Sequence, residues 1–126
     1  MAIDTETTGL NDMRADLVGI SLCVEAGTAC YIPLTHKDAG SNDLFGSDSL
    51  AEGQLGLDDV LAVLKPLLED PAVLKIGQNM KYDAKILARY GVTIAPIEDT
   101  MLLSYALHAG LHGHGMDALS ERYLNH

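Results

Sequence analysis

Apolar and polar residues alternate along the first third of the chain, which is the pattern of half-buried β-strands. Residues 17–25 place apolar side chains at every second position, on one strand face: Val18, Ile20, Leu22 and Val24. A turn signal (Ala-Gly) follows at positions 26–27, and residues 28–34 are again rich in β-branched and aromatic types. Together with an extended segment at residues 1–6, this pattern predicts a three-stranded antiparallel meander.

The predicted hairpin carries both cysteines of the chain. A two-residue turn at positions 26–27 would set Cys23 opposite Cys30 across the two strands. Two cysteines are too few for a disulfide scaffold or for a cysteine zinc site. We expect both thiols to be reduced and half-buried.

The pattern changes to a helical period after residue 56. Residues 36–56 are rich in Gly, Ser and Asp and have no period, which is typical of a mobile acidic loop. The next apolar residues form one helical stripe: Leu57, Val60, Leu61, Leu64, Leu67 and Leu68. Pro66 is expected to kink or divide this helix, and the Asp-Pro pair at 70–71 is expected to end it.

Strands and helices then alternate to the end of the chain. The predicted elements are a buried strand at 73–76, a helix at 79–90, a strand at 92–97, a helix at 99–109 and a helix at 116–124. Gly77 ends the first of these strands, Gly91 closes the helix before the second strand, and Asp99 is the expected N-cap of the next helix. A meander followed by this alternation predicts an α/β fold, with a mixed sheet flanked by helices, in a single domain over residues 1–126.

The composition is that of one globular domain and limits its partners. The 126 residues are 48% apolar and 21% charged, and no run approaches the ~18 apolar residues of a membrane span. No secretory leader opens the sequence, so we expect a cytoplasmic protein without a membrane partner. Because 8 basic residues accompany 18 acidic ones, the net charge is −10, and a broad basic face for binding nucleic acid is not expected.

Two carboxylates stand close together near the start of the chain. Asp4 and Glu6 are two positions apart on a predicted strand, so their side chains share one face. Carboxylates held in this way repel each other unless a cation, a shared proton or water separates them. Hard oxygen ligands suit Mg²⁺ or Mn²⁺, although the same pattern also occurs at exposed strand edges.

A third carboxylate lies on a predicted apolar helix face. Asp83 shares this face with Asn79, Ile86, Leu87 and Tyr90, at helical spacing. A carboxylate among apolar residues requires a partner. A surface Asp at the edge of the stripe is the other interpretation of this position.

Two motifs carry a resemblance to a known family. Residues 4–10 (Asp-Thr-Glu-Thr-Thr-Gly-Leu) resemble the first motif of the DEDD 3′–5′ exonucleases, and residues 77–83 (Gly-Gln-Asn-Met-Lys-Tyr-Asp) resemble the second. Residues 99–105 and 116–124 narrow the resemblance to the proofreading domain of bacterial family A DNA polymerases, the DNA polymerase I type. The resemblance covers nearly the whole chain, in order and at compatible spacing.

The resemblance implies a ribonuclease H-like fold and hydrolysis of the 3′-terminal phosphodiester of single-stranded DNA with two Mg²⁺ or Mn²⁺ ions. It implies that Asp4, Glu6 and Asp83 are the catalytic metal ligands. The residues implied to contact the DNA are Leu10 against the terminal base, and Gln78, Asn79 and Tyr82 around the last nucleotides. The polymerase domain of a parent protein is the implied partner.

The fourth acid of the family has no counterpart in this chain. In the polymerase type it belongs to a Tyr-x-x-x-Asp motif further along, and no tyrosine here is followed by Asp at that spacing. His112 and Asp117 have the His-x-x-x-x-Asp spacing of another DEDD subclass, but Gly113 and Gly115 indicate a loop, and Asp117 is expected to cap the last helix. Leu111 stands where the family has a basic residue.

Three histidines belong to the same glycine-rich segment. His108, His112 and His114 could suggest a metal cluster. Because no cysteine accompanies them, a solvated loop is the expectation, and not a zinc site.

Three functions remain open at this point. The first is a 3′–5′ exonuclease domain without its third motif, as a fragment or the product of a shortened gene, with little activity of its own. The second is a non-catalytic ribonuclease H-like remnant that acts as a scaffold or partner-binding module, with self-association through the apolar face left by the missing helix. The third is a related 3′–5′ ribonuclease, which would recognise the 2′-hydroxyl.

Overall fold

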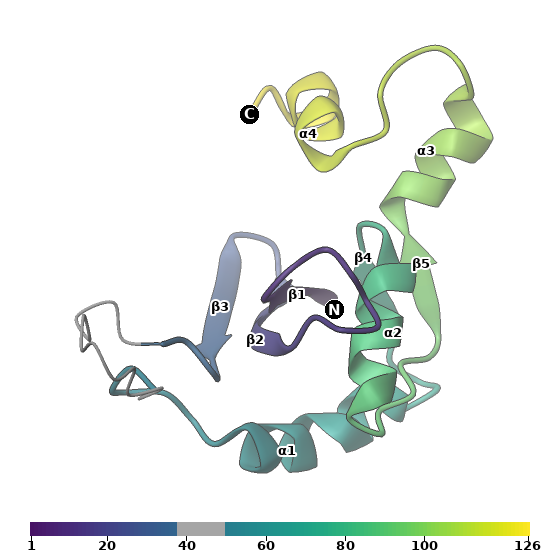
Figure 1. The fold of residues 1–126 in the computed structure, drawn as a ribbon. Helices are drawn as coiled ribbons and strands as arrows, with labels where there is room; N and C mark the ends of the chain where they lie inside the picture. The colour runs from purple at the N-terminus through teal and green to yellow at the C-terminus, as the bar shows by residue number, and fades with distance from the viewer. Residues whose placement is uncertain (38–49) are drawn as a thin grey trace.

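A five-stranded mixed sheet forms the centre of the protein (Figure 1). The computed structural model describes residues 1–37 and 50–126, so residues 38–49 of the predicted acidic loop lie outside it. The strands are β1 (Ala2–Thr7), β2 (Leu17–Glu25), β3 (Thr28–Pro33), β4 (Lys75–Gly77) and β5 (Ile97–Asp99). Their order is β3-β2-β1-β4-β5, in which β1 to β3 form an antiparallel meander and β4 and β5 run parallel to β1. The predicted fold class is confirmed.

The register of the β2–β3 hairpin separates the two cysteines. Leu22 pairs with Cys30 and Cys23 pairs with Ala29, because the register shifts between Cys23 and Glu25. Consecutive strand residues point to opposite faces, so the two thiols lie on different faces of the sheet. The predicted facing of Cys23 and Cys30 is therefore wrong, since a bulge adds a residue to one strand. Both thiols are free as expected, but Cys30 is exposed and not half-buried.

The helices of the described residues are α1 (Leu57–Glu69), α2 (Met80–Arg89), α3 (Thr100–His108) and α4 (Met116–Leu124). Helices α1 and α2 cover one face of the sheet. The core packs between the sheet and the first two: Ile3, Leu17, Ile20, Val60, Leu61, Leu64, Leu68, Met80, Ile86 and Leu87 are all buried. Helix α1 continues through Pro66, so the predicted division at this proline is wrong. Burial of Leu64 and Leu68 on either side of it offsets the lost backbone hydrogen bond.

The apolar residues in and beside strand β4 are less buried than the sequence predicted. Lys75 is the fully buried residue, and its Nζ donates to the carbonyl oxygens of Asp70, at 3.0 Å, and of Ala95. Leu74 and Ile76 are 41% and 37% exposed. The strand predicted at 73–76 is therefore present, at Lys75–Gly77, but its predicted burial as an apolar strand is wrong, because only the face carrying Lys75 is covered.

The last strand is displaced along the sequence from its predicted position. The structure has β5 at Ile97–Asp99, and the predicted strand at 92–97 is wrong over most of its length. Val92 and Ile94 are buried in the core without pairing in the sheet. The alternating apolar pattern at these positions correctly predicted burial but not strand pairing, because tertiary packing determines the backbone conformation here.

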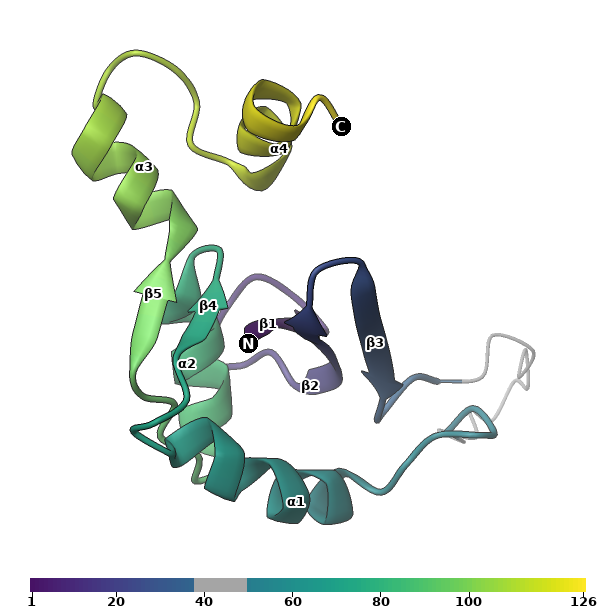
Figure 2. The same cartoon turned by 180° about the vertical axis from the view of Figure 1, so that it is seen from behind.

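Among the described residues, no helix packs directly on the second face of the sheet. Figures 1 and 2 show α3 and α4 extending beyond the end of the sheet. A hollow of about 680 Å³ lies between this open face and the two helices, and its walls include Ala2, Asp4, Ile76, Leu107 and Tyr123. Within the described residues, no helix is long and apolar enough to cross a membrane.

Asp99 joins the beginnings of two helices. Its carboxylate accepts from the backbone N–H groups of Met101 and Leu102, at 2.9 and 3.2 Å, which confirms the predicted cap of α3. It also accepts from Asn79 and Met80, at 3.1 and 2.9 Å, in the first residues of α2. This second cap was not predicted, and it fixes the direction in which α2 leaves β4.

We expect Asp99→Ala to lower the free energy of unfolding by about 3 kcal/mol, because two helix caps worth roughly 1–2 kcal/mol each are lost. Urea unfolding followed by circular dichroism measures this change. Asp117→Ala is the control, since Asp117 lies in the first turn of α4 without a capping bond. Equal losses in the two variants would contradict the double cap.

Candidate active site

Asp4 and Glu6 share one face of β1, as the sequence predicted, and the structure shows that this is the open face of the sheet. Ile3 and Thr5, which alternate with them, are 3% and 8% exposed and face the core. Asp4 is half-buried and Glu6 is exposed. The alternation of the strand therefore directs both carboxylates to the face that borders the hollow.

Asp83 is buried where β1 and β4 separate. It is 3% exposed, and its Oδ1 accepts from the backbone N–H of Thr5 at 3.0 Å and from the Thr5 hydroxyl at 2.6 Å. The strand β4 pairs with β1 only at Ala2 and Ile76, so Asp83 satisfies a backbone donor that β4 does not reach. The expected partner is thus found in Thr5, and the interpretation of Asp83 as a surface residue is wrong.

The three carboxylates influence one another electrostatically. Burial raises the pKa of Asp4 above its ordinary 3.8, and the negative charges of Asp83 and Glu6 raise it further. Burial also raises the pKa of Asp83, while the hydrogen bonds from Thr5 oppose this and the charge of Asp99 adds to it. A cation between these groups would relieve the repulsion.

The side chains of this site are of the type that binds a hard divalent cation, but they are not arranged around a common point. Asp4, Glu6 and Asp83 supply only oxygen donors, which Mg²⁺ and Mn²⁺ prefer. Among the described residues, no three Asp, Glu, His or Cys side chains form a ready-made metal site. Binding a cation would therefore require the carboxylate side chains to move closer together, and the cation would offset the repulsion that Asp4 already experiences.

The residues expected to contact DNA have different surroundings. Leu10 is 97% exposed, at the tip of the turn after β1. The Tyr82 hydroxyl lies 2.5 Å from the carbonyl oxygen of Gly9 and 2.6 Å from the Thr7 hydroxyl. Tyr82 therefore holds the turn that presents Leu10, a role that the sequence did not predict.

Gln78 and Asn79 lie between β4 and α2. The Gln78 Nε2 donates to the carbonyl oxygen of His114 at 2.7 Å, and its Oε1 accepts from the Thr100 hydroxyl. Asn79 is exposed and has a left-handed backbone, with φ 59°. Its side chain is therefore accessible, whereas the amide of Gln78 is engaged with the segment after α3.

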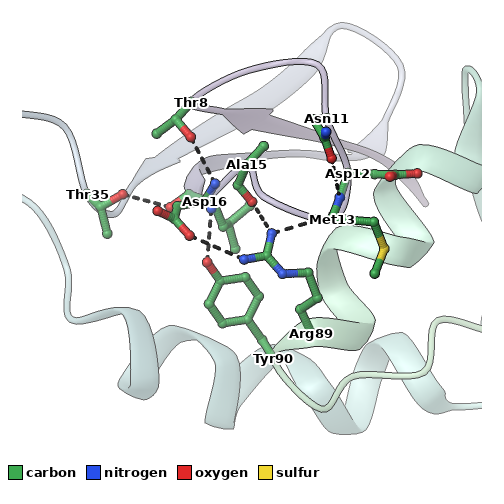
Figure 3. Close-up of polar contacts among 10 residues, drawn as sticks. Thr8, Asn11, Asp12, Met13, Ala15, Asp16, Thr35, Arg89 and Tyr90 are labelled. Carbon is green, nitrogen blue, oxygen red and sulfur yellow. Dashed lines mark hydrogen bonds and ion pairs between the residues drawn. The ribbon is translucent and has the colours of Figure 1, made fainter.

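Helix α2 also holds the loop that follows the first motif. Figure 3 shows the Arg89 guanidinium donating to the carbonyl oxygen of Ala15 and pairing with Asp16, with a nitrogen–oxygen distance of 3.4 Å. The Tyr90 hydroxyl accepts from the backbone N–H of Leu17 at 3.0 Å. These contacts join segments more than 70 residues apart, and no local pattern in the sequence could have identified them.

The histidine segment differs from its expected structure. The ring centroids of His108 and His112 lie 5.4 Å apart, and those of His112 and His114 lie 4.9 Å apart. His114 is 7% exposed and its Nδ1 lies 2.7 Å from the Ser104 hydroxyl. The segment between α3 and α4 is a loop as predicted, but it is not fully solvated, because the three rings pack on one another and the ring of His114 packs on Tyr105.

Neither Asp117 nor Asp99 is placed to bind a metal ion together with Asp4. Gly115 is the N-cap of α4, and Asp117 follows in its first turn without a capping bond. The prediction of Asp117 as the N-cap is therefore wrong. Asp117 is also absent from the walls of the hollow that Asp4 borders, and both oxygens of Asp99 accept from helix N–H groups.

The fold places the protein in the ribonuclease H-like class, and solved structures that include a nuclease share it. NrnC from Brucella melitensis with bound Mg²⁺ superposes with a TM-score of 0.71 and 26% identity, over 99% of this chain and 53% of that one. Escherichia coli RNase D superposes with a TM-score of 0.66 over 99% of this chain and 28% of its own. Its 20% identity shows the fold alone.

The sequence comparison identifies the family. A family model described as 3′–5′ exonuclease, that of the family A DNA polymerases, matches residues 1–126, so the chain belongs to this family. DNA polymerase I from Rhizobium leguminosarum is 49% identical over all of this chain, and that from Pseudomonas aeruginosa is 43% identical. The chain spans 13% of the length of each of these two relatives.

Neutralising Asp83 should stabilise the fold in a pH-dependent way. Because the pKa of Asp83 is raised on folding, the folded protein binds this proton more tightly than the unfolded chain does. This contribution is complete below the ordinary pKa of 3.8 and is lost as the pH rises through the raised value. We expect Asp83→Asn to be more stable by about 1 kcal/mol at neutral pH, with a smaller difference near the ordinary pKa.

Urea unfolding of both proteins across this pH range measures the difference. Glu25→Gln is the control for removing one negative charge from an acidic chain, because Glu25 is exposed at the end of β2. A variant that is less stable than the parent at neutral pH would mean that the bonds from Thr5 outweigh the cost of burying the charge.

Proposed function

We propose that this chain removes nucleotides from the 3′ end of single-stranded DNA by metal-dependent hydrolysis of the terminal phosphodiester. The observation that carries the proposal is the set of three carboxylates, Asp4, Glu6 and Asp83, of which Glu6 and Asp83 both repel Asp4, in a chain of the 3′–5′ exonuclease family. Two bound Mg²⁺ or Mn²⁺ ions would supply an activated water and stabilise the leaving oxygen.

Each carboxylate would contribute differently to holding these cations. Asp4 and Glu6 present their oxygens from a rigid strand, so their spacing is fixed by the strand itself. Asp83 is oriented by the Thr5 N–H and hydroxyl through Oδ1, which leaves Oδ2 for a cation. Because the chain carries a net charge of −10, cations would also reduce its repulsion of a phosphate backbone.

The DNA end would lie between the open face and the turn after β1. Leu10 would contact the terminal base, since it is almost fully exposed and an unstacked base offers an apolar face. Tyr82 would act mainly by holding this turn through Gly9 and Thr7. Asn79, whose side chain is accessible, would contact the last nucleotides from the other side. Gln78 would join it by exchanging its bonds to His114 and Thr100 for bonds to the strand.

The proposal extends to the location and partner of the domain. The two DNA polymerase I relatives are matched over only 13% of their length. We therefore propose that the domain works beside a polymerase domain, as a proofreading unit in the bacterial cytoplasm.

Metal binding tests the assignment of the ligands separately from activity. We expect Asp4→Ala and Asp83→Ala each to weaken Mn²⁺ binding about tenfold or more in calorimetric titrations, because the charge of the ligand set governs affinity. Asp117→Ala is the control and should bind as the parent does. Loss of affinity in Asp117→Ala alone would favour the His112 and Asp117 alternative and contradict the three-ligand site.

Hydrolysis is then measured on 5′-labelled oligonucleotides with Mg²⁺ or Mn²⁺. Stepwise shortening that Asp83→Ala abolishes is the expected result. Matched DNA and RNA strands distinguish the deoxyribonuclease from a ribonuclease, the second candidate, because only RNA carries the 2′-hydroxyl. NrnC, which shares this fold, has been solved with bound pGG. Preference for RNA would overturn DNA as the substrate while leaving the site in place.

The hollow favours one non-catalytic alternative, self-association of two copies of the chain. Leu107 borders it and is 73% exposed, and large exposed apolar surfaces often mark interaction sites. If this alternative holds, sedimentation velocity shows a dimer that Leu107→Ser dissociates. Val63→Ser is the matched control, because Val63 is 75% exposed on α1, and a monomer at all concentrations rejects the alternative.

A further inference from the structure

Tyr31 lies on the same face of the sheet as the proposed metal ligands. In the register of the sheet, Asp4 pairs with Ser21, and Ser21 pairs with Tyr31. Directly paired residues on neighbouring antiparallel strands share one face. The phenol of Tyr31 therefore projects from β3 onto the open face that carries Asp4 and Glu6.

Gly19 allows this phenol to lie across β2 toward Glu6. A Cβ atom at position 19 would lie 2.0 Å from the Tyr31 hydroxyl oxygen and 2.4 Å from the adjoining ring carbon. Gly19 is also the register partner of Glu6, so the hydroxyl rests on the residue next to this carboxylate. Burial raises the pKa of Tyr31, and the negative charge of Glu6 raises it further.

His36 holds the hydroxyl in this position. Its Nε2 lies 2.6 Å from the Tyr31 hydroxyl oxygen, and the two rings meet edge to face with centroids 5.8 Å apart. The backbone of His36 is itself fixed by Gln54, whose Oε1 accepts from the His36 N–H at 2.6 Å and whose Nε2 donates to its carbonyl at 2.9 Å. Because Gln54 fixes the backbone of His36, it also fixes the position from which the imidazole extends toward Tyr31.

This pairing can leave a donor for a substrate. When Nε2 of His36 carries a proton, it donates to the phenol oxygen, and the Tyr31 O–H is then available to another acceptor. Tyr31 is 44% exposed, so a bound strand can reach it. Tyrosine hydroxyls are common contacts of nucleic-acid phosphates, and they add no negative charge to an acidic face.

We infer that Tyr31, positioned by His36, donates a hydrogen bond to a phosphate oxygen of the DNA strand whose end lies at Asp4 and Glu6. This inference rests on the proposed function and adds a contact to it from β3. Tyr31 is the residue that touches the substrate, and His36 is a positioning residue that acts through it. Gly19 is required because any side chain there would displace the phenol.

Fluorescence anisotropy of a short labelled single-stranded deoxyoligonucleotide tests the contact without hydrolysis. Ca²⁺ is used in place of Mg²⁺, because it supplies the same charge with a less strict geometry. We expect Tyr31→Phe to weaken binding about fivefold to tenfold, the loss of one hydrogen bond to a charged oxygen. Tyr105→Phe, at an exposed tyrosine of α3 outside the walls of the hollow, is the matched control and should bind as the parent does.

Two further variants distinguish positioning from general disruption. His36→Ala should weaken binding as Tyr31→Phe does, and the double variant should lose no more than either, because both act through one contact. His36→Gln, which retains a side-chain donor, should restore part of the affinity. Gly19→Ala should also reproduce the loss, and thermal unfolding verifies that each variant is folded.

The outcomes separate this inference from the function on which it rests. Binding by the parent chain with unchanged affinity in Tyr31→Phe overturns the Tyr31 contact and leaves the proposed function in place. Additive losses in the double variant overturn the positioning role of His36. Absence of binding by the parent chain overturns the proposed function, and the inference with it.

Discussion

β1 and β4 pair at a single position, Ala2 with Ile76, before they separate, and the rest of the site depends on how this separation is filled. The N–H of Thr5 faces the gap and would be a buried, unsatisfied donor without a partner. Asp83 supplies the acceptor from α2. A carboxylate is thereby held among apolar neighbours beside Asp4, although its burial opposes its charge. A structural requirement of the sheet and a chemical requirement of the site are met by one side chain.

Side-chain hydrogen bonds at both ends of α2 fix the position of this helix beside the gap. Asp99 caps both α2 and α3, so two helices begin at neighbouring points at the end of the parallel strands. Arg89 and Tyr90, near the end of α2, fix the loop that connects β1 to β2. Helix α2 therefore determines the position of both motif segments, and a change in its direction would move Asp83 and the turn bearing Leu10 together.

The sequence was sufficient for the elements whose patterns are local. The alternation in β2 and the apolar stripe of α1 predicted their types, and the spacing of Asp4 and Glu6 predicted their common face. The displaced strand β5 and the burial of Lys75 were not predictable, because each depends on packing between distant segments. The separation of Cys23 from Cys30 depends on a bulge, which strand alternation does not reveal.

The candidate site was predictable to a similar extent. The motifs indicated Asp83 as a ligand but not its contact with Thr5, which joins residues 78 positions apart. Tyr31 and His36 carry no motif. Only the register of the sheet places Tyr31 in line with Asp4, and only the space above Gly19 lets its phenol lie toward Glu6. The packed rings of His108, His112 and His114 likewise depend on how the chain turns after α3.

The most direct test of the account is to locate a bound cation by nuclear magnetic resonance. Mn²⁺ broadens the signals of nuclei close to it, so substoichiometric Mn²⁺ added to the isotope-labelled protein identifies the residues around its site. The account predicts selective broadening of the amide signals of Asp4, Thr5, Glu6 and Asp83. Broadening centred on His108, His112 and His114, or on Asp117, with the signals of β1 unchanged would contradict it.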